Sequence, residues 1–285
     1  MSRELLLEID GFQFAAQEWG ERDQLPVLAL HGWLDNSASF SPLSAYLHKI
    51  NLVAVDMAGH GQSHHRQGFT PYHLWEDVAD VFALADALGW QNFALLGHSR
   101  GAIVAMLAAG TFPERITHLG LIEGLFPDPE STLSPPQQLA NAIKAMRTFG
   151  RKAPTVYPEL AKAVEAREQG MFPLTPAAAR LLTERGVRAV EDGYIWSTDR
   201  KLLAPAAVKF TREQIEAFIA SITAPIKLIL GQDGIPRRFA SFQREVEIFP
   251  QVDVVQLTGG HHLHMEQEVE AVAATLNQFF HSMDK

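Results

Sequence analysis

The sequence predicts an α/β protein with a doubly wound sheet, because short apolar runs alternate along the chain with amphipathic helical patterns. Six short, mostly apolar runs are typical of strands covered on both faces, and they lie at residues 27–30, 52–55, 93–96, 119–122, 226–230 and 252–257. Residues 74–88 and 269–280 place apolar side chains on one helical stripe. Helices of this kind bury their stripes against the faces of such a sheet.

Two further strand-like segments begin the chain. Residues 5–9 and 12–19 alternate in polarity, and Asp10 and Gly11 separate them. An Asp-Gly pair between two strand-like segments is a strong signal for a hairpin. We therefore expect an antiparallel hairpin at this end of the sheet.

The composition excludes several classes of protein. The 285 residues are 47% hydrophobic and 20% charged, which is ordinary for a globular protein with a core. The formal net charge of −9 argues against a nucleic-acid-binding surface. The chain has no cysteine, which excludes disulfides, cysteine-ligated zinc, iron–sulfur clusters and a thiol nucleophile. No apolar run approaches the roughly 20 residues of a membrane span, so we expect a soluble, cytoplasmic protein.

The strand–helix alternation stops between residues 125 and 206. This stretch is rich in proline and carries short helical patterns at residues 137–149, 157–169 and 176–184. We expect a helical cap at residues 125–206, inserted in a core formed by residues 1–124 and 207–285. The alternative is a plain helical elaboration of a single domain.

The strongest local motif surrounds Ser99. Residues 97–101 read Gly-His-Ser-Arg-Gly, after one predicted strand and before an apolar helix at residues 102–109. A G-x-S-x-G motif in that context places a nucleophilic serine on a tight strand-to-helix turn, where flanking side chains would clash. The helix N-terminus also supplies N–H groups where an oxyanion would form. An ordinary glycine-rich turn is the alternative.

Two other loops complete the expected chemistry. His31, Gly32 and Trp33 follow the strand at 27–30, and the backbone N–H groups of Trp33 and Arg100 are the expected oxyanion donors. Trp33 could also be a buried aromatic or a pocket wall. A histidine-rich loop at residues 259–266 follows the strand at 252–257, where it could supply the base that a serine nucleophile needs. Metal binding by this loop is the weaker alternative.

These motifs together resemble the α/β-hydrolase fold superfamily over residues 1–124 and 207–285. The resemblance rests on residues 31–33, residues 56–63 (Asp-Met-Ala-Gly-His-Gly-Gln-Ser), the turn at Ser99, and Gly260-His261 followed by Glu266. It implies a mostly parallel eight-stranded sheet. It also implies that His261, rather than His262 or His264, is the base. Residues 56–63 are then a structural turn.

A narrower resemblance is to the serine hydrolase-like branch of that superfamily, near epoxide hydrolases and haloalkane dehalogenases. Residues 31–40 and residues 192–202 (Asp-Gly-Tyr-Ile-Trp-Ser-Thr-Asp-Arg-Lys-Leu) carry it. Those two enzyme classes use an aspartate nucleophile, whereas this chain has Ser99. The resemblance therefore implies hydrolysis of a small ester or thioester through an acyl-serine, without cofactor or metal. Alternatives are C–C bond hydrolysis or other chemistry on this scaffold, and a ligand-binding protein with a relic triad.

The acid of the triad is open between two residues. The common family position follows strand 7 in a Gly-x-x-Asp pattern, but here that position is Gly234 and the carboxylate, Asp233, comes one residue early. Glu123 resembles the strand-6 placement of some dehalogenases. Either carboxylate would hold the histidine tautomer and stabilise the imidazolium. We favour Glu123 slightly over Asp233, with Asp128 as a remote third choice.

Substrate contacts are expected from His31, Gly32, Trp33 and Phe126. Six apolar residues of the insertion could line an acyl pocket, although any one of them could equally belong to a plain core: Phe126, Met146, Phe149, Met171, Phe172 and Trp196. The expected partner is a small-molecule substrate, with no nucleic acid and no membrane. The sequence is silent on the oligomeric state and on the identity of the substrate.

Overall fold

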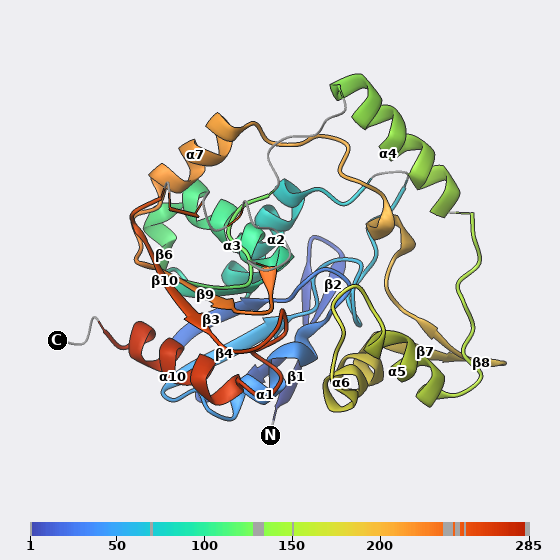
Figure 1. Cartoon of the computed structure of the whole chain (residues 1–285), viewed down its shortest axis with the longest axis horizontal. Helices are drawn as coiled ribbons and strands as arrows, with labels where there is room; N and C mark the ends of the chain where they lie inside the picture. The colour runs from blue at the N-terminus through green and yellow to red at the C-terminus, as the bar shows by residue number, and fades with distance from the viewer. Residues whose placement is uncertain are drawn as a thin grey trace.

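A central sheet of eight strands organises the computed structural model, which describes residues 2–68, 71–127, 134–149, 151–235, 242, 246–247 and 249–282 (Figure 1). The spatial order is β1-β2-β4-β3-β5-β6-β9-β10. The strands are Arg3–Ile9 (β1), Phe12–Trp19 (β2), Leu25–Leu30 (β3), Ile50–Val55 (β4), Phe93–His98 (β5), Ile116–Ile122 (β6), Ile226–Gly231 (β9) and Val252–Leu257 (β10). Among the described residues of this sheet, only the β1–β2 and β2–β4 pairings are antiparallel. The predicted mostly parallel sheet is therefore confirmed.

The N-terminal hairpin forms where the sequence predicts it. Ile9 pairs with Phe12 across a two-residue turn. Asp10 and Gly11 have φ values of 52° and 81°, the left-handed conformations that a tight hairpin turn requires at both central positions.

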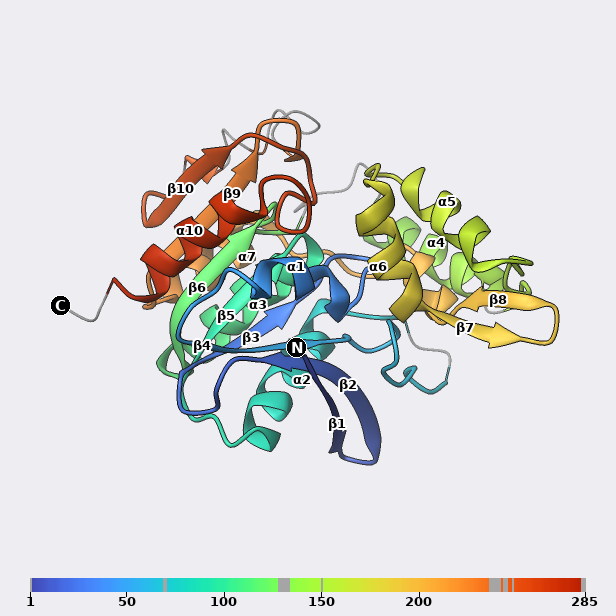
Figure 2. The same ribbon diagram turned by 90° about the horizontal axis from the view of Figure 1, so that it is seen from below.

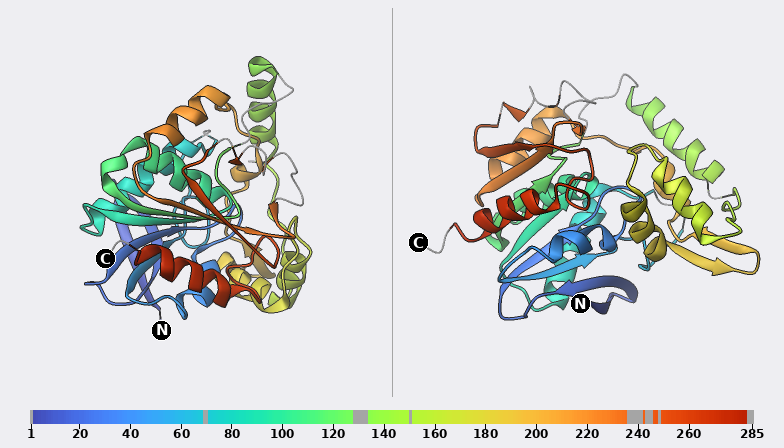
Figure 3. Two further views of the ribbon diagram at one scale, coloured as in Figure 1. Left: turned by 60° about the vertical axis from the view of Figure 1, so that its left-hand side comes forward. Right: turned by 60° about the horizontal axis from the view of Figure 1, so that its bottom comes forward.

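Helices cover both faces of the sheet (Figure 3). Helices α2 (Leu74–Ala87), α3 (Arg100–Thr111) and α7 (Arg212–Ser221) pack on one face, and α1 (Ser41–Ser44) and α10 (Val269–Phe280) on the other. Neighbouring strand residues serve opposite faces: Leu95 belongs to the first core and Leu96 to the second. This alternation is the period of two that a pleated strand imposes, and it explains why the central strands are apolar throughout.

The segment between β6 and α7 forms a separate group of elements beside the sheet (Figure 2). It contains α4 (Pro135–Phe149), α5 (Leu160–Glu168), α6 (Pro176–Gly186), β7 (Val187–Val190), β8 (Gly193–Trp196) and the 3₁₀-helix η3 (Arg200–Leu203). The hairpin β7–β8 was not expected, because each strand has four residues and β7 is half-buried or exposed throughout. The division of the chain at residues 125 and 206 stays a prediction.

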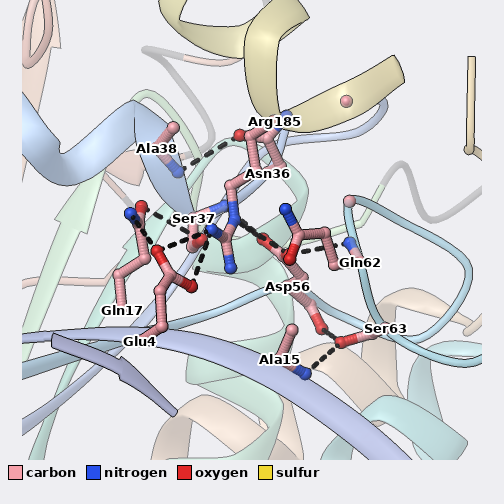
Figure 4. A network of polar contacts seen from close by, with 12 residues as sticks. Glu4, Ala15, Gln17, Asn36, Ser37, Ala38, Asp56, Gln62, Ser63 and Arg185 are labelled. Carbon is pink, nitrogen blue, oxygen red and sulfur yellow. Dashed lines mark hydrogen bonds and ion pairs between the residues drawn. The ribbon is translucent and has the colours of Figure 1, made fainter. Parts of the chain in front are cut away.

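A buried ion pair ties this segment to the sheet (Figure 4). The Asp56 carboxylate, directly after β4, accepts from Arg185 Nε of α6 at 2.9 and 3.0 Å. It also accepts from the backbone N–H groups of Ser37 at 2.8 Å and Gln62 at 2.9 Å. Arg185 reaches Glu4 of β1 as well. These contacts support the interpretation of residues 56–63 as a structural turn.

Among the helices that the described residues form, none is long and apolar enough to span a membrane.

Candidate active site

Ser99 occupies a strained turn between β5 and α3. Its φ is 51° and its ψ is −116°, a backbone conformation that L-residues rarely adopt. The flanking glycines are needed for space: a Cβ on Gly101 would lie 2.0 Å from the carbonyl oxygen of Leu30, and one on Gly97 would lie 2.5 Å from Cα of Ala102. The turn therefore has the geometry that the G-x-S-x-G motif predicts.

Three side chains from different loops form a hydrogen-bonded line. Ser99 Oγ lies 3.0 Å from Nε2 of His261. Nδ1 of the same ring lies 3.0 Å from Oε2 of Glu123. When Nδ1 carries the proton and donates to the carboxylate, Nε2 is free to accept the proton of the Ser99 hydroxyl. The arrangement can therefore activate a serine for attack on an electrophilic carbon.

Glu123 is held as firmly as Ser99. It follows β6 with a φ of 54°, and its backbone N–H donates to the carbonyl oxygen of Ile229 at 2.9 Å. Its carboxylate accepts from the backbone N–H groups of Gly231 and Ile235, each at 2.6 Å. Burial raises the pKa of Glu123 to about 7, although these two N–H donors and His262 act to lower it.

The two candidate acids occupy different environments. Asp233 is exposed, and its backbone N–H donates to the carbonyl oxygen of Gly259. Gly234, the usual family position of the acid, is buried, and a Cβ there would lie 2.1 Å from Oε2 of Glu123. The Glu123 carboxylate thus occupies the space that a side chain at position 234 would need. Asp128 lies outside the described residues.

The loop after β3 places Gly32 and Trp33 at the site. Both line the cavity above Ser99, and the Trp33 indole N–H donates to the carbonyl oxygen of Leu202 at 3.0 Å. The Arg100 side chain turns away to Asp77, with a contact of 2.5 Å. The expected contribution of Arg100 to the site is therefore its backbone N–H and not its side chain. The binding of an oxyanion by the backbone N–H groups of Trp33 and Arg100 stays a prediction.

A cavity of about 360 Å³ lies over Ser99, between the sheet core and the segment that contains α5, β8 and η3. Aromatic and apolar side chains form much of its wall: Trp33, Leu34, Tyr157, Met171, Phe172, Trp196 and Leu203. Three of the six insertion residues singled out from the sequence, Met171, Phe172 and Trp196, are therefore in the wall. The volume is at the small end of the range for ligand sites, roughly 300–1,000 Å³.

Two of the expected substrate contacts, His31 and Phe126, are absent from the described residues that line the cavity. His31 is fully buried beneath the loop, and its Nε2 accepts from the backbone N–H of Met57 at 3.0 Å while Nδ1 faces the carbonyl oxygen of Gly32. The His31 ring therefore supports the backbone of the loop after β3 and of the turn after β4. Phe126 packs in the hydrophobic core against Phe242 and Phe249, because the chain turns inward directly after β6.

The loop that carries His261 packs against the inserted segment. The Phe172 ring stacks on the His261 imidazole with centroids 3.8 Å apart and an interplanar angle of 23°. Glu266 accepts from the backbone N–H of Thr175, next to α6, at 2.8 Å. Met265 packs among apolar residues of α5 and α6. The His261 ring is thus oriented from two sides, by Glu123 and by the inserted segment.

Asp35 links the histidine loop to α5. One carboxylate oxygen lies 2.5 Å from the Arg167 guanidinium, and the other lies 3.2 Å from His262 Nε2 and 3.6 Å from His98 Nδ1. Burial acts to raise the pKa of Asp35, but His262, Arg167 and His98 hold it well below its usual range. Asp35, His98 and His262 lie close enough together to bind a metal ion. The adjacent guanidinium disfavours a cation, because it already neutralises the only carboxylate of the three.

Sequence reasoning missed several charged residues of this cavity, namely Asp35, Arg167, Asp199 and Arg200. Asp35 meets Arg167 across 132 positions of the chain, and no spacing rule predicts such a contact. Asp199 and Arg200 belong to the motif at residues 192–202, which was noted as a family signature without a role. That motif was the available signal.

The comparison with known families agrees with this geometry. A model of the alpha/beta hydrolase family matches residues 27–275, and the chain belongs to that family. Serine hydrolase-like protein from Danio rerio is 28% identical over 278 residues, which cover 94% of this chain and 85% of that protein. The chain is therefore a hydrolase of the α/β-hydrolase fold.

Two solved structures extend the comparison. A hypothetical protein from Pseudomonas aeruginosa PAO1 is 40% identical, with a TM-score of 0.91 and 99% of each chain covered. A thioesterase domain from the curacin biosynthetic pathway is 27% identical, with a TM-score of 0.84, covering 97% of this chain and 99% of that one. The whole chain, including the inserted segment, therefore has structural counterparts.

Proposed function

We propose that the protein hydrolyses a small carboxylic ester or thioester through an acyl-serine intermediate. The observation that carries the proposal is the hydrogen-bonded line from Ser99 to His261 to Glu123, beneath a cavity large enough for a small molecule. Ser99 attacks the acyl carbon while His261 accepts its proton. His261 then protonates the leaving alcohol or thiol, and water enters by the same route to release the acid.

Glu123 is the acid of this triad. It faces Nδ1 of His261, so that its charge favours the required tautomer and stabilises the imidazolium that forms during attack. Asp233 serves as a surface residue of the same loop. The curacin-pathway neighbour is a thioesterase by its description, which supports including thioesters among the substrates.

The backbone N–H groups of Trp33 and Arg100 stabilise the oxyanion. Trp33 lines the cavity beside Ser99, and Arg100 is the first residue of α3. Donors placed where negative charge develops, such as these, are worth about 10²–10³ in rate each. In this proposal, residues 125–206 act as a cap that closes the site. The substrate is a small molecule, and the protein acts in the cytoplasm.

The test is hydrolysis of a panel of p-nitrophenyl esters and acyl thioesters by the wild-type protein and by Ser99→Ala. We expect wild-type turnover to fall by about 10⁴–10⁶-fold in the variant. A fluorophosphonate probe should label the wild-type protein and leave Ser99→Ala unlabelled. Unchanged hydrolysis by Ser99→Ala would refute the nucleophile. If the protein hydrolyses a β-diketone and none of the esters or thioesters, its activity is C–C bond hydrolysis and not ester hydrolysis.

A further inference from the structure

The charged side chains in the cavity wall do not all pair with one another. Besides Ser99 and His261, the wall contains two carboxylates, Asp35 and Asp199, and two guanidiniums, Arg167 and Arg200. Asp35 and Arg167 pair with each other at 2.5 Å. The remaining two residues are neighbours in sequence, but they do not pair.

Asp199 is satisfied by groups other than Arg200. Its carboxylate accepts from the Tyr72 hydroxyl at 2.8 Å and from the backbone N–H of Lys201 at 3.0 Å. The Lys201 ammonium lies 3.3 Å from it, and His65 lies 3.8 Å away. The negative charge of Asp199 is therefore already compensated on the side of Lys201.

Arg200 has no carboxylate partner among the described residues. Its recorded hydrogen bond runs from Nη1 to the carbonyl oxygen of Ala153, at 3.1 Å. Its Nε is buried and makes no hydrogen bond within the described part of the chain. A guanidinium has five N–H donors, so most of the donors of this half-buried side chain stay available to a ligand. Arg200 is thus a cation of the cavity wall without a carboxylate counter-ion among the described residues.

We propose that Arg200 binds an anionic group of the substrate, a carboxylate remote from the bond that is cleaved. This inference rests on the proposed function and narrows its substrate class to esters or thioesters that carry a free carboxylate. A guanidinium presents its donors in a planar fork that matches a carboxylate with two hydrogen bonds. Ser99 and Arg200 line the same cavity of about 360 Å³, so one small molecule can contact both.

The rest of the wall fits such a substrate. Trp33, Trp196 and Leu203 provide apolar surface that suits a short hydrocarbon spacer between the carboxylate and the reacting carbonyl. Arg200 begins η3, and the side chain of Asp199 caps this 3₁₀-helix, so the backbone of Arg200 is fixed before the ligand arrives. A preorganised cation binds its anion without the cost of ordering a loop.

The experiment compares matched pairs of substrates that differ only in charge. p-Nitrophenyl monoesters of glutaric and adipic acid, with a free terminal carboxylate, are compared with the same esters that end in a carboxamide. 4-Acetoxybenzoate and 4-acetoxybenzamide place the charge on the leaving group instead. Rates with Ser99→Ala give the spontaneous background. We expect the wild-type kcat/KM to favour the charged member of at least one pair by about 10–100-fold, the range of a charge-assisted hydrogen bond.

The variant Arg200→Gln should abolish this preference, because it raises the KM of the charged substrate far more than the KM of the neutral substrate. Arg200→Lys, which keeps the charge but loses the fork, should retain part of it. Arg180→Gln is the matched control, because Arg180 is an exposed residue of α6 paired with Glu184. Equal rates for charged and neutral substrates in every pair, or a preference that survives in Arg200→Gln, would overturn the proposal.

A binding measurement separates this inference from the proposed function. Titration calorimetry of Ser99→Ala with glutarate and with glutaramide needs no turnover. We expect glutarate to bind at least 10-fold more tightly than glutaramide, and Arg200→Gln to remove the difference. If no ester is hydrolysed but glutarate binds through Arg200, the proposed ester hydrolysis is refuted and the proposed anion site is supported. If esters are hydrolysed but glutarate and glutaramide bind with equal affinity, the proposed anion site is refuted and the proposed ester hydrolysis is supported.

Discussion

The three residues of the proposed triad are positioned by two different means. Ser99 and Glu123 end the neighbouring strands β5 and β6, and both have left-handed backbone conformations. The Ser99 N–H donates to the carbonyl oxygen of Ile122 at 2.8 Å. His261, by contrast, lies in a loop beyond the edge strand β10, where the Phe172 ring of the inserted segment covers it.

The difference shows which contacts the chemistry depends on. Sheet hydrogen bonds set the positions of Ser99 and Glu123, so these positions are as rigid as the sheet itself. Side-chain packing sets His261, including contacts from a segment that joins the sheet core through Asp56 and Arg185. Changes in the inserted segment should therefore act on the base and leave the nucleophile and acid in place.

The largest expected effect comes from the strand-borne acid. Glu123→Gln should lower kcat by about 10⁴-fold, because an amide neither stabilises the imidazolium nor favours the right tautomer. Asp233→Asn, the matched change in the competing residue, should stay within a few-fold of wild type. Steady-state kinetics on a p-nitrophenyl ester measures both. The reverse ranking would assign the acid to Asp233.

Moving the acid tests whether its position or its strand matters. The double variant Glu123→Gly with Gly234→Asp places a carboxylate in the space that Glu123 fills. We expect it to recover about 10²-fold of the activity that Glu123→Gly loses. Gly234→Asp alone should be inactive or poorly folded, because its Cβ would lie 2.1 Å from the Glu123 carboxylate. Failure of the double variant to exceed Glu123→Gly would show that only β6 can supply the acid.

The next largest effect is expected from a change at the junction between the sheet core and the inserted segment. Arg185→Met leaves the Asp56 carboxylate buried without its ion-pair partner, which should lower the free energy of unfolding by about 3–5 kcal/mol. Urea denaturation measures this loss. Arg180→Met, an exposed change on the same helix, is the control and should alter stability by less than about 0.5 kcal/mol. Equal stability of the two variants would mean that the ion pair does not hold the regions together.

A smaller effect is expected where the inserted segment covers the base. Phe172→Leu should lower kcat by about 10-fold with little change in KM, because the imidazole loses its stacked ring but keeps Glu123. Phe172→Tyr keeps the ring and should retain most of the activity. A change in KM alone would make Phe172 a wall of the cavity with no influence on His261.

The pH profile gives the most specific signal for the environment of Glu123. The proposed mechanism requires ionised Glu123 and neutral His261. Because burial raises the pKa of Glu123 to about 7, the ionised fraction falls as the pH drops through 7, and kcat/KM should fall with it. Asp233→Asn should leave this acid limb in place. A profile that stays flat down to pH 5 would contradict the raised pKa.

The sequence predicts the fold and the turn at Ser99 well because both signals are local. The apolar runs mark each central strand, and the glycines at positions 97 and 101 mark the turn at Ser99. It leaves the acid open because Glu123 and Asp233 both follow strands whose ends meet in space. Only the three-dimensional structure shows that Glu123 fills the space beside Gly234.

The cavity is much less predictable than the triad. Arg167 meets Asp35, and Trp33 meets Leu202, across more than 130 residues of chain. The expected contact Phe126 lies in the core instead, since an aromatic residue in a loop carries no signal of the side to which it turns. The hairpin β7–β8 was missed because its short, half-exposed strands lack a continuous apolar run.

The proposed placement of the acid on β6 has an evolutionary consequence for the turn after β9. Among the described residues of that turn, Gly231 and Ile235 hold Glu123 through backbone N–H groups, and these contacts do not depend on the side chains of residues 232 and 233. Selection on the proposed acid therefore constrains the size of residues 231 and 234 and makes no demand on the side chains of residues 232 and 233. The rim of the site can change its chemistry there without loss of the triad.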